Sequence, residues 1–426
     1  MSTASVNVHY HGSNSSPTCH SDEVIHTLIN PGDTFDYDVL FPGDEPPGLY
    51  WYHPHVHGIA ESAVQGGASG AIIVEGIQNL QPAVAGLPQR LLIIRDQNLP
   101  TGSPGPGNGV PSWDLSVNYV PILYPAYAPA KLVMRPGEKQ FWRVLNAAAD
   151  TILDLQLQFD GAPQTVQIAA LDGVPTGSQD GTRQGKLVPA THILIPPAGR
   201  AEFIVTGPAP GVKSATLYTL NIDTGPDGDS DPMRPILSIQ TSASAPEPAL
   251  VPSVSGPAGP QRFEGLAAAT PNITRTLYFS EKNAQQQFFI TVDGQMPTLF
   301  NADNPPAITT TQGSVEDWII QNRSQEDHEF HMHQIHFLLL EQNGSPAPPQ
   351  AQQFLDMIQV PYWTGTGPYP SVKVRMDFRG PDIGDFVYHC HILNHEDQGM
   401  MAIIRVNPRD PDQTPAVADA APETPR

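Results

Sequence analysis

Basic side chains are scarce in this chain of 426 residues: 21 Lys and Arg stand against 43 Asp and Glu, giving a formal net charge of −22. A surface with so few cations repels the phosphates of nucleic acids and anionic lipids, so we exclude both as partners. The sequence also has no apolar run near the roughly 18–20 residues that a membrane-crossing helix needs. Neutral and cationic molecules remain as partner classes.

Cysteine is almost absent, with Cys19 and Cys390 as the two examples. At most one bridge can form, so a disulfide framework is excluded. The segment Met1 to Val8 has neither the basic residues nor the apolar run of a signal peptide.

Helical periodicity of useful length is missing as well. The chain holds 47 prolines and 36 glycines, a composition that interrupts helices and suits short strands joined by turns. We therefore predict an all-β fold of the sandwich type. The predicted strands are Thr34–Leu40, Ala71–Glu75, Arg90–Arg95, Thr151–Phe159, Ala201–Val205, Thr276–Phe279, Glu316–Gln321 and Met401–Val406.

The chain is too long for one ordinary domain, and its composition suggests where it divides. Gln78–Pro88 and Ser242–Gly265 have the composition of linkers, and the Pro-, Ala- and Asp-rich end, residues 408–426, is predicted to be a disordered tail. This gives a first unit at 1–80, a middle unit at 88–245 and a last unit at 270–407.

Two segments of the middle and last units align without a gap, Arg135–Asn146 and Thr311–Asn322. The alignment pairs Gly137 with Gly313, Trp142 with Trp318, and Asn146 with Asn322. Continued at the same offset, it sets Ile152, Leu155 and Leu157 against His328, His331 and His333. The middle unit is therefore predicted to be a repeat of the last one with aliphatic residues in place of histidines.

Histidines gather in four motifs. They are His9-Tyr-His11, His53-Pro-His55, His328-Glu-Phe-His331-Met-His333, and His389-Cys-His391-Ile-Leu-Asn-His395-Glu-Asp-Gln-Gly-Met400. Residues i and i+2 of a strand point to the same side, so each His-x-His pair offers two imidazoles to one site. Eight imidazoles from four pairs are more than one ion can take, which predicts a cluster of metals. Cys390 points away from its two flanking histidines, so one strand is expected to link two metal sites.

The second site can be interpreted from its ligand types. Cys390, His328 and His395, with Met400 five residues after His395, form the His₂Cys set with a weak axial thioether that is typical of blue-copper electron-transfer sites. Zinc is the competing metal, but it needs no thioether and is redox-inert. Met401 competes with Met400 as the axial ligand, and the spacing favours Met400.

With all four motifs in order, the chain resembles the multicopper oxidases, in particular laccase-like bacterial members with three domains. The resemblance implies three cupredoxin-like domains, each a Greek-key β-sandwich, and four copper ions. It assigns the type 1 copper to His328, Cys390, His395 and Met400, the type 2 copper to His9 and His331, and the type 3 pair to His11, His53 and His391 on one ion and His55, His333 and His389 on the other. The family normally has several strands before the first motif, so we expect the first domain to be truncated at its N-terminus.

The resemblance also implies a reaction: one-electron oxidation of phenols or aromatic amines, coupled to four-electron reduction of dioxygen to water. Glu396 and Asp22 resemble positions that deliver protons in this family. Two alternatives stay open, a metallo-oxidase acting on cuprous, ferrous or manganous ions and a non-catalytic cupredoxin-fold protein. The family implies a periplasmic or secreted location, whereas the start of this chain leaves a cytoplasmic one open. The oligomeric state is not indicated.

Other conspicuous residues are given structural interpretations. His20, His26, His57, His192 and His336 are expected to be structural or exposed, and Cys19 to be a lone buried thiol. The run Asp227-Gly-Asp-Ser-Asp231 is expected to be a turn, since it lacks the Gly and Glu of a calcium loop. The loop Gln342–Gln353 and its neighbour Asp356 are candidates for the substrate pocket.

Overall fold

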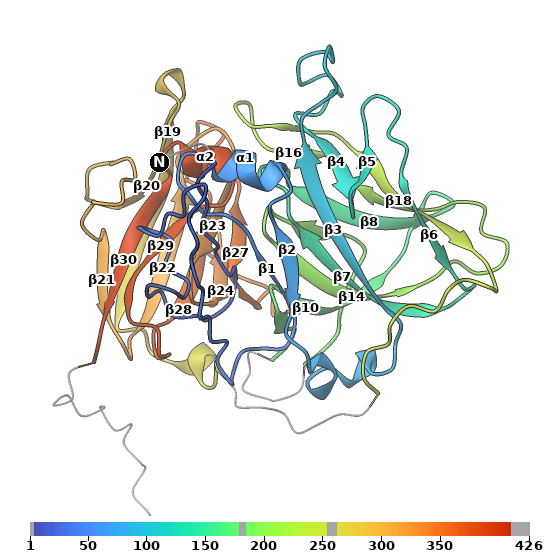
Figure 1. Ribbon diagram of the computed structural model, residues 1–426, viewed down its shortest axis with the longest axis horizontal. Helices are drawn as coiled ribbons and strands as arrows, with labels where there is room; N and C mark the ends of the chain where they lie inside the picture. Colours follow the sequence, from blue (N-terminus) through green and yellow to red (C-terminus); the bar gives the residue numbers. More distant parts are fainter. Residues whose placement is uncertain (1–3, 179–184, 254–261, 410–426) are drawn as a thin grey trace, which may run out of the picture.

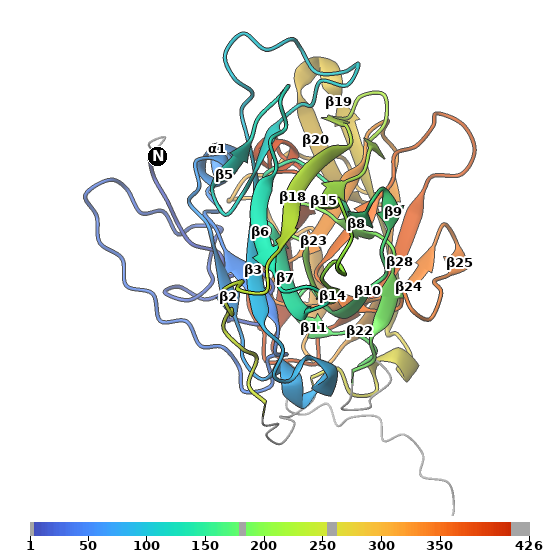
Figure 2. The ribbon, with the colours of Figure 1, turned by 90° about the vertical axis from the view of Figure 1, so that its right-hand side faces the viewer.

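The computed structural model describes residues 4–178, 185–253 and 262–409. Two β-sandwiches stand side by side, and residues 4–80 lie against their junction (Figures 1 and 2). Helices are short: α1 (Ala60–Gln65), α2 (Leu393–Asp397) and the 3₁₀ turns η1 (Ile77–Asn79), η2 (Pro82–Val84), η3 (Leu266–Ala268) and η4 (Asn283–Gln285). The prediction of an all-β fold is confirmed. The predicted tail from residue 410 onward and the centre of the second predicted linker, 254–261, lie outside the described residues.

The middle sandwich, green in Figure 1, packs an eight-stranded sheet on a six-stranded one. The larger sheet has the order β11-β10-β14-β7-β3-β4-β5, with β12 beside β10. Its strands are β3 (Gln89–Gln97), β4 (Asp114–Val117), β5 (Val120–Ile122), β7 (Lys139–Asn146), β10 (Val166–Leu171), β11 (Val174–Pro175), β12 (Val188–Ala190) and β14 (Arg200–Thr206). The smaller sheet, β13-β8-β15-β18-β6 with β9 beside β8, contains β6 (Ala130–Met134), β8 (Leu153–Phe159), β9 (Ala162–Pro163), β13 (Ile193–Ile195), β15 (Ala215–Thr219) and β18 (Arg234–Thr241). A separate pair, β16 (Ile222–Asp223) and β17 (Ser230–Asp231), borders it.

The last sandwich, orange to red in Figure 1, packs a seven-stranded sheet on a five-stranded one. The larger sheet, β20-β19-β22-β28-β24-β25 with β26 beside β24, contains β19 (Ile273–Lys282), β20 (Gln287–Val292), β22 (Val315–Asn322), β24 (Phe337–Gln342), β25 (Ser345–Pro346), β26 (Phe354–Leu355) and β28 (Ser371–Asp377). The smaller sheet, β21-β30-β29-β23-β27, contains β21 (Ile308–Thr311), β23 (His328–Met332), β27 (Met357–Val360), β29 (Gly384–Cys390) and β30 (Met401–Asn407).

The first unit forms no sandwich within residues 4–80. A two-stranded antiparallel sheet, β1 (Leu49–Tyr52) with β2 (Gly70–Ile73), is its regular structure, and His9 pairs with His53 in an isolated bridge. Leu49 and Trp51 are buried in a cluster that also takes residues from both sandwiches: Leu145, Ala147, Ala198 and Met357. This shared apolar cluster fixes the first unit at the junction.

Seven of the eight predicted strands fall in β2, β3, β8, β14, β19, β22 and β30. The prediction of a strand at Thr34–Leu40 is wrong, because this segment has no sheet partner and lies mostly exposed. The division into three domains at the stated boundaries stays a prediction. No helix among the described residues is long and apolar enough to cross a membrane.

The predicted repeat is visible in the hydrogen bonds of two buried asparagines. Nδ2 of Asn146, at the end of β7, donates to the carbonyls of Thr151 and Ile195 at 2.9 and 3.0 Å. Nδ2 of Asn322, at the end of β22, donates to the carbonyls of Glu326 and Val360 at 2.8 and 3.0 Å. Each asparagine thus ties the end of one sheet to a strand of the facing sheet, but Thr151 follows Asn146 by five residues whereas Glu326 follows Asn322 by four. The extra residue shifts the alignment by one, so Leu155 and Leu157 pack into the core as Phe330 and Met332 do. The prediction that aliphatic residues stand in place of His331 and His333 is therefore wrong.

Candidate metal centres

The pairing of β23 with β29 separates two kinds of ligand. Phe330 lies opposite Cys390, and His331 lies opposite His389. Cys390 and Phe330 belong to the apolar core of the last sandwich, whereas His389 contacts the ring of His55 in the first unit. Strand alternation therefore directs the sulfur into the sandwich and the imidazole towards the first unit, as the sequence predicts.

The sulfur of Cys390 lies at one corner of a small triangle of ligand atoms, the thiolate site. Sγ is 3.7 Å from Nδ1 of His328 and 3.8 Å from Nδ1 of His395, and the two nitrogens are 3.2 Å apart. A point equidistant from these atoms lies about 2 Å from each, which matches metal bonds to imidazole and thiolate. All three side chains are buried.

The methionine predicted to complete the thiolate site lies close to it in the chain and in the core. The backbone N–H of Cys390 donates to the carbonyl of Met400 at 3.1 Å, and both residues belong to the same apolar cluster. Met401 packs in a different cluster, with Val387 and Phe300. This arrangement favours Met400 over Met401 as the axial ligand.

Eight buried imidazoles from the first and last units form a second group, the histidine cluster. The structure brings them together in sets whose ring nitrogens lie within 4.8 Å of one another: His9, His11 and His331; His11, His53 and His391; and His55, His333 and His389. In the last set the Nε2 atoms are 3.1 to 3.2 Å apart. Unprotonated nitrogens this close repel one another, so the sets call for cations between them.

Each of several imidazoles is held by one nitrogen and leaves the other buried without a hydrogen-bond partner among the described residues. Nδ1 of His9 contacts Asp22, Nδ1 of His53 contacts the carbonyl of Pro54, and Nδ1 of His331 contacts the carbonyl of Asp356. Their Nε2 atoms are unpaired. Buried polar atoms are rarely left without a hydrogen-bond partner. Histidines that bind a metal show this pattern of one paired nitrogen and one free nitrogen. The donor set of imidazoles, a thiolate and a thioether fits copper.

Burial keeps these imidazoles neutral. It lowers the pKa of His53 and His389 to about 3 and that of His395 to about 4, and neighbouring imidazoles lower the first two further. Burial also raises the pKa of the Cys390 thiol well above its usual value. The nitrogens are thus ready to bind a metal, while the sulfur releases a proton when it does so.

The two predicted proton-delivery acids both touch the histidine cluster. Asp22 accepts a hydrogen bond from Nδ1 of His9 at 3.0 Å and from Nε2 of Gln334 at 2.5 Å. The carboxylate of Glu396 lies between two rings, 3.1 Å from Nδ1 of His389 and 3.6 Å from Nδ1 of His55. Burial raises the pKa of both acids well above the usual range, which favours their protonated forms.

A cavity of about 250 Å³ reaches the thiolate site from outside, and His395 is part of its wall. Its other polar walls are mainly acidic and come from both sandwiches: Asp150, Asp227, Asp229, Asp231, Glu326 and Asp327. Oε1 of Glu326 lies 3.4 Å from Nε2 of His395. The run Asp227–Asp231, predicted to be a turn, joins β16 to β17 and supplies three of these acids. We name this space the acidic cavity.

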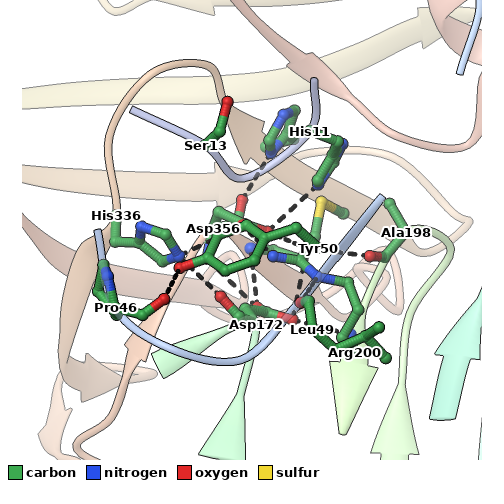
Figure 3. A network of polar contacts seen from close by, with 12 residues as sticks. His11, Ser13, Pro46, Leu49, Tyr50, Asp172, Ala198, Arg200, His336 and Asp356 are labelled. Atoms are coloured by element: carbon green, nitrogen blue, oxygen red, sulfur yellow. Dashed lines mark hydrogen bonds and ion pairs between the residues drawn. The ribbon is translucent and has the colours of Figure 1, made fainter. Parts of the chain in front are cut away.

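The structure places the candidate pocket residues elsewhere. Gln342, Asn343, Gln350 and Gln353 line a different cavity of about 390 Å³ between the two sandwiches, and that cavity does not include His395. Asp356 is fully buried and contacts His11 and Arg200 rather than a substrate space (Figure 3).

Sequence reasoning missed two residues beside the histidine cluster. Arg200 is fully buried and paired with Asp356, and neither was assigned a role near a metal. The available signal was a carboxylate inside an apolar run, Phe354-Leu-Asp-Met-Ile358, because a charge in such a run needs a buried partner.

The remaining histidines mostly agree with their structural interpretation. His20, His26 and His192 are exposed, and His57 is partly buried. His336 is fully buried, with Nε2 2.8 Å from the carbonyl of Asp172 and 3.5 Å from Asp356. The prediction of a buried thiol at Cys19 is wrong, because Cys19 lies in an exposed turn, where it is a free thiol.

Comparison with known proteins identifies the family of this chain. Multicopper oxidase family models match residues 1–79 and 269–410, together just over half of the chain. The chain is a member of the multicopper oxidase family. It is therefore a copper-dependent oxidoreductase, and dioxygen is the usual electron acceptor of that family.

Similar curated proteins carry consistent names. The "Multicopper oxidase MmcO" of Mycobacterium tuberculosis is 25% identical, over 92% of this chain and 75% of the relative. The "Multicopper oxidase mco" of Staphylococcus haemolyticus is 24% identical, over 89% and 72%. The "Laccase" of Bacillus subtilis is 22% identical, over 85% and 71%.

Solved structures show the same fold. A variant of the multicopper oxidase McoA from Aquifex aeolicus superposes with a TM-score of 0.71 at 21% identity, covering 95% of this chain and 84% of the other. A Campylobacter jejuni multicopper oxidase described as a metallo-oxidase has a TM-score of 0.68 at 22% identity, covering 95% and 81%. At this identity the likeness concerns the fold alone.

Proposed function

We propose that this protein couples one-electron oxidation of a small aromatic substrate, a phenol or an aromatic amine, to the four-electron reduction of dioxygen to water. One observation carries the proposal. Cys390 has its sulfur in the thiolate site, and its two neighbours in the chain, His389 and His391, belong to the histidine cluster. A few covalent bonds therefore join the two proposed centres.

The proposed copper ligands follow the observed sets. His328, Cys390, His395 and Met400 would hold the type 1 ion, and His9 and His331 the type 2 ion. The type 3 pair would be held by His11, His53 and His391 and by His55, His333 and His389. When bound, copper supplies one-electron redox chemistry at the thiolate site and multi-electron reduction at the histidine cluster.

The substrate would give up its electron in the acidic cavity. His395 belongs both to the wall of this cavity and to the thiolate site, so a bound donor approaches the site through one imidazole. Trp113 and Phe288 provide apolar walls for a ring, and Phe288 stacks on His395 with ring centroids 4.3 Å apart.

Reduction of one dioxygen to two waters consumes four protons, and we propose that Glu396 and Asp22 pass them on one at a time and are reprotonated from solvent. Glu396 lies between Nδ1 of His389 and Nδ1 of His55. Asp22 accepts a hydrogen bond from His9 and from Gln334. A buried carboxyl with a raised pKa suits general acid catalysis.

The acidic lining of the cavity favours a second candidate, oxidation of metal cations. The ionised members of this group of acids attract a cationic donor more strongly than a neutral phenol. The same lining also favours protonated aromatic amines among organic substrates. Cuprous, ferrous and manganous ions are the alternatives to test.

The experiment combines metal analysis, an absorption spectrum and oxygen uptake. We expect about four copper ions per chain, a blue protein, and oxygen uptake with a phenol or an aromatic amine; uptake with ferrous, manganous or cuprous ions alone would instead select the metallo-oxidase. Cys390→Ser should abolish the blue colour, and a variant that stays blue contradicts the assignment of the thiolate site. About one copper per chain without oxygen uptake would indicate the non-catalytic alternative.

By the same family resemblance we propose a periplasmic or secreted location. Fractionation of cells that produce the natural protein tests this, and recovery of the protein with cytoplasmic markers would contradict it.

A further inference from the structure

Asp356 lies between β26 and β27 and contacts two imidazoles of the histidine cluster. Oδ1 of its carboxylate is 3.3 Å from Nε2 of His11, and its backbone carbonyl accepts a hydrogen bond from Nδ1 of His331 at 2.8 Å. Figure 3 shows the carboxylate between His11 and Arg200. A single residue thus holds one ring from the first unit and one from the last.

Arg200, at the start of β14 in the middle sandwich, fixes this carboxylate. Nη1 donates to Oδ1 of Asp356 at 2.7 Å and Nη2 donates to Oδ2 at 2.5 Å, a two-pronged contact that sets the plane of the carboxylate. The guanidinium also donates to the carbonyls of Leu49 at 3.1 Å and Ala198 at 3.0 Å. Contacts on several sides leave it one orientation.

Asp172 fixes the backbones of both partners. It follows β10 in the middle sandwich, and its Oδ1 accepts the backbone N–H of Arg200 at 2.9 Å. Its Oδ2 accepts the N–H groups of Asp356 and Met357, each at 3.3 Å. The middle sandwich therefore holds both the main chain and the side chain of Asp356.

The backbone of the first unit passes close to the Arg200–Asp356 pair. Gly12, next to His11, has φ +82°, and a Cβ atom there would lie 2.5 Å from Nη2 of Arg200 and from Oδ2 of Asp356. A side chain at this position would collide with the ion pair, and the positive φ also favours glycine. The Gly12 backbone thus lies too close to the pair to leave room for a side chain.

These contacts determine which ring nitrogens are free. When Asp356 accepts the proton of Nε2, His11 keeps Nδ1 unprotonated, and that atom is buried without a partner among the described residues. His331 donates through Nδ1 to the same residue and keeps Nε2 unprotonated. A carboxylate or carbonyl behind a histidine selects the nitrogen that binds the metal.

We propose that Arg200 is a positioning residue for the copper site: by fixing the carboxylate of Asp356, it sets which ring nitrogen His11 presents to the metal. The inference rests on the proposed function, since it takes His11 as a ligand. It gives the middle unit, which supplies no proposed ligand, a part in building the histidine cluster.

The test compares Arg200→Met and Arg200→Lys with a matched control, Arg143→Met. Arg143 forms another buried ion pair in the same sheet, with Glu202, whose Oε2 accepts the N–H of Leu49. The control therefore removes a similar interaction beside the same residue without touching the cluster. The first readout is the ¹⁵N shifts of His11 and His331 in the metal-free protein, which report the tautomers. The second is copper content, blue absorption and oxygen uptake of the loaded enzyme.

In Arg200→Met we expect mixed tautomers at His11, retained blue absorption, and a loss of about 10–100-fold in copper affinity of the cluster and in oxygen reduction. Arg200→Lys should recover part of this loss, because it keeps the charge but not the two-pronged contact. Arg143→Met should keep native tautomers and oxygen reduction.

Wild-type tautomers and oxygen reduction in Arg200→Met would overturn the proposal, and so would an equal loss in Arg143→Met. Should Arg200→Met fail to fold, Arg200→Lys decides: a few-fold loss of copper affinity supports the proposal and a wild-type affinity overturns it. A wild-type protein with one copper and no oxygen uptake would instead refute the proposed function itself.

Discussion

The middle and last sandwiches share the same framework, but the last one contains proposed metal ligands and the middle one contributes none. Trp142 and Trp318 are both fully buried, and each donates its indole N–H to the residue two positions earlier. On the following strands, Leu155 packs into the apolar core as Phe330 does, whereas the next residue, His331, lies on the opposite side of its strand and joins the histidine cluster. The two apolar cores are thus built alike, and the imidazoles of the histidine cluster lie outside the core of the last sandwich.

The middle sandwich still contributes residues beside the proposed metal centres of the last one. Its β16–β17 turn supplies acids to the cavity beside His395, and its Arg200 holds Asp356 beside His11. Without proposed ligands of its own, the middle unit thus forms a wall beside one proposed centre and supports the other.

The strongest way to break the comparison is to make the last unit resemble the middle one. His331→Leu removes one imidazole from the cluster, and we expect oxygen reduction to fall by about 1,000-fold or more. The fold should persist, because His331 lies outside the apolar core and its pairing with Met357 and His389 is made by the backbone. Oxygen uptake and circular dichroism measure the two effects.

The blue absorption provides the control for His331→Leu. It should remain, since the thiolate site keeps Cys390 and both of its histidines. Retention of full oxygen uptake would show that His331 is not part of the oxygen-reducing site.

The sequence predicts well those features that depend on residues close together in the chain. Alternation in β29 separates Cys390 from His389, and the ungapped match of Trp142 with Trp318 reveals the repeat. What it does not reveal depends on contacts between units far apart in the chain: Arg200 and Asp356 are 156 residues apart, and no spacing rule connects them. The wrong strand at Thr34–Leu40 has a related cause, since a β-like pattern needs a sheet partner that only the tertiary fold supplies.

Acid should affect the two sandwiches differently once copper is removed. An unfolded histidine titrates near pH 6.5, whereas burial lowers the pKa of folded His389 to about 3 and of His395 to about 4. Between these values the unfolded chain binds more protons, so the free energy of unfolding is fully present above about pH 6.5 and decreases as pH falls towards 3–4. The loss is on the order of 1–2 kcal/mol for each buried imidazole at pH 5.

The middle unit should respond in the opposite sense. Its described histidine, His192, is exposed, and burial raises the pKa of Asp231 to about 7. The folded state of this unit therefore holds a proton between about pH 4 and 7 that the unfolded state releases as pH rises, so acid favours folding there. Acids of the last unit offset part of its loss, because burial raises the pKa of Glu281 to about 8 and that of Glu326 to about 7. Hydrogen exchange of the metal-free protein at pH 7.5 and 5 should therefore show the loss of protection at β23 and β29, which carry buried imidazoles, and unchanged protection of these two strands would contradict it.

The reverse substitution tests whether framework alone can make a site. Leu155→His puts an imidazole where the middle unit has an apolar core, with no second histidine to share a metal. Burying an unpaired polar group should cost about 2–4 kcal/mol of unfolding free energy. Chemical denaturation measures this, with Leu155→Met as a control of similar volume; stabilisation of Leu155→His by added copper would show that the framework already contains a latent site.

The smallest expected effect concerns the acids that the middle unit contributes to the acidic cavity. Asp227 and Asp229 line it beside His395, so neutralising both as Asp227→Asn and Asp229→Asn reduces its attraction for cations. We expect KM for a cationic aromatic amine to rise about 3–10-fold at low salt, with KM for a neutral phenol and kcat for both nearly unchanged. Added salt should shrink the difference between wild type and variant, because screening acts only on the charge term. An equal change for amine and phenol would mean that the turn shapes the cavity rather than selecting charge, and the middle unit would then be a purely steric wall.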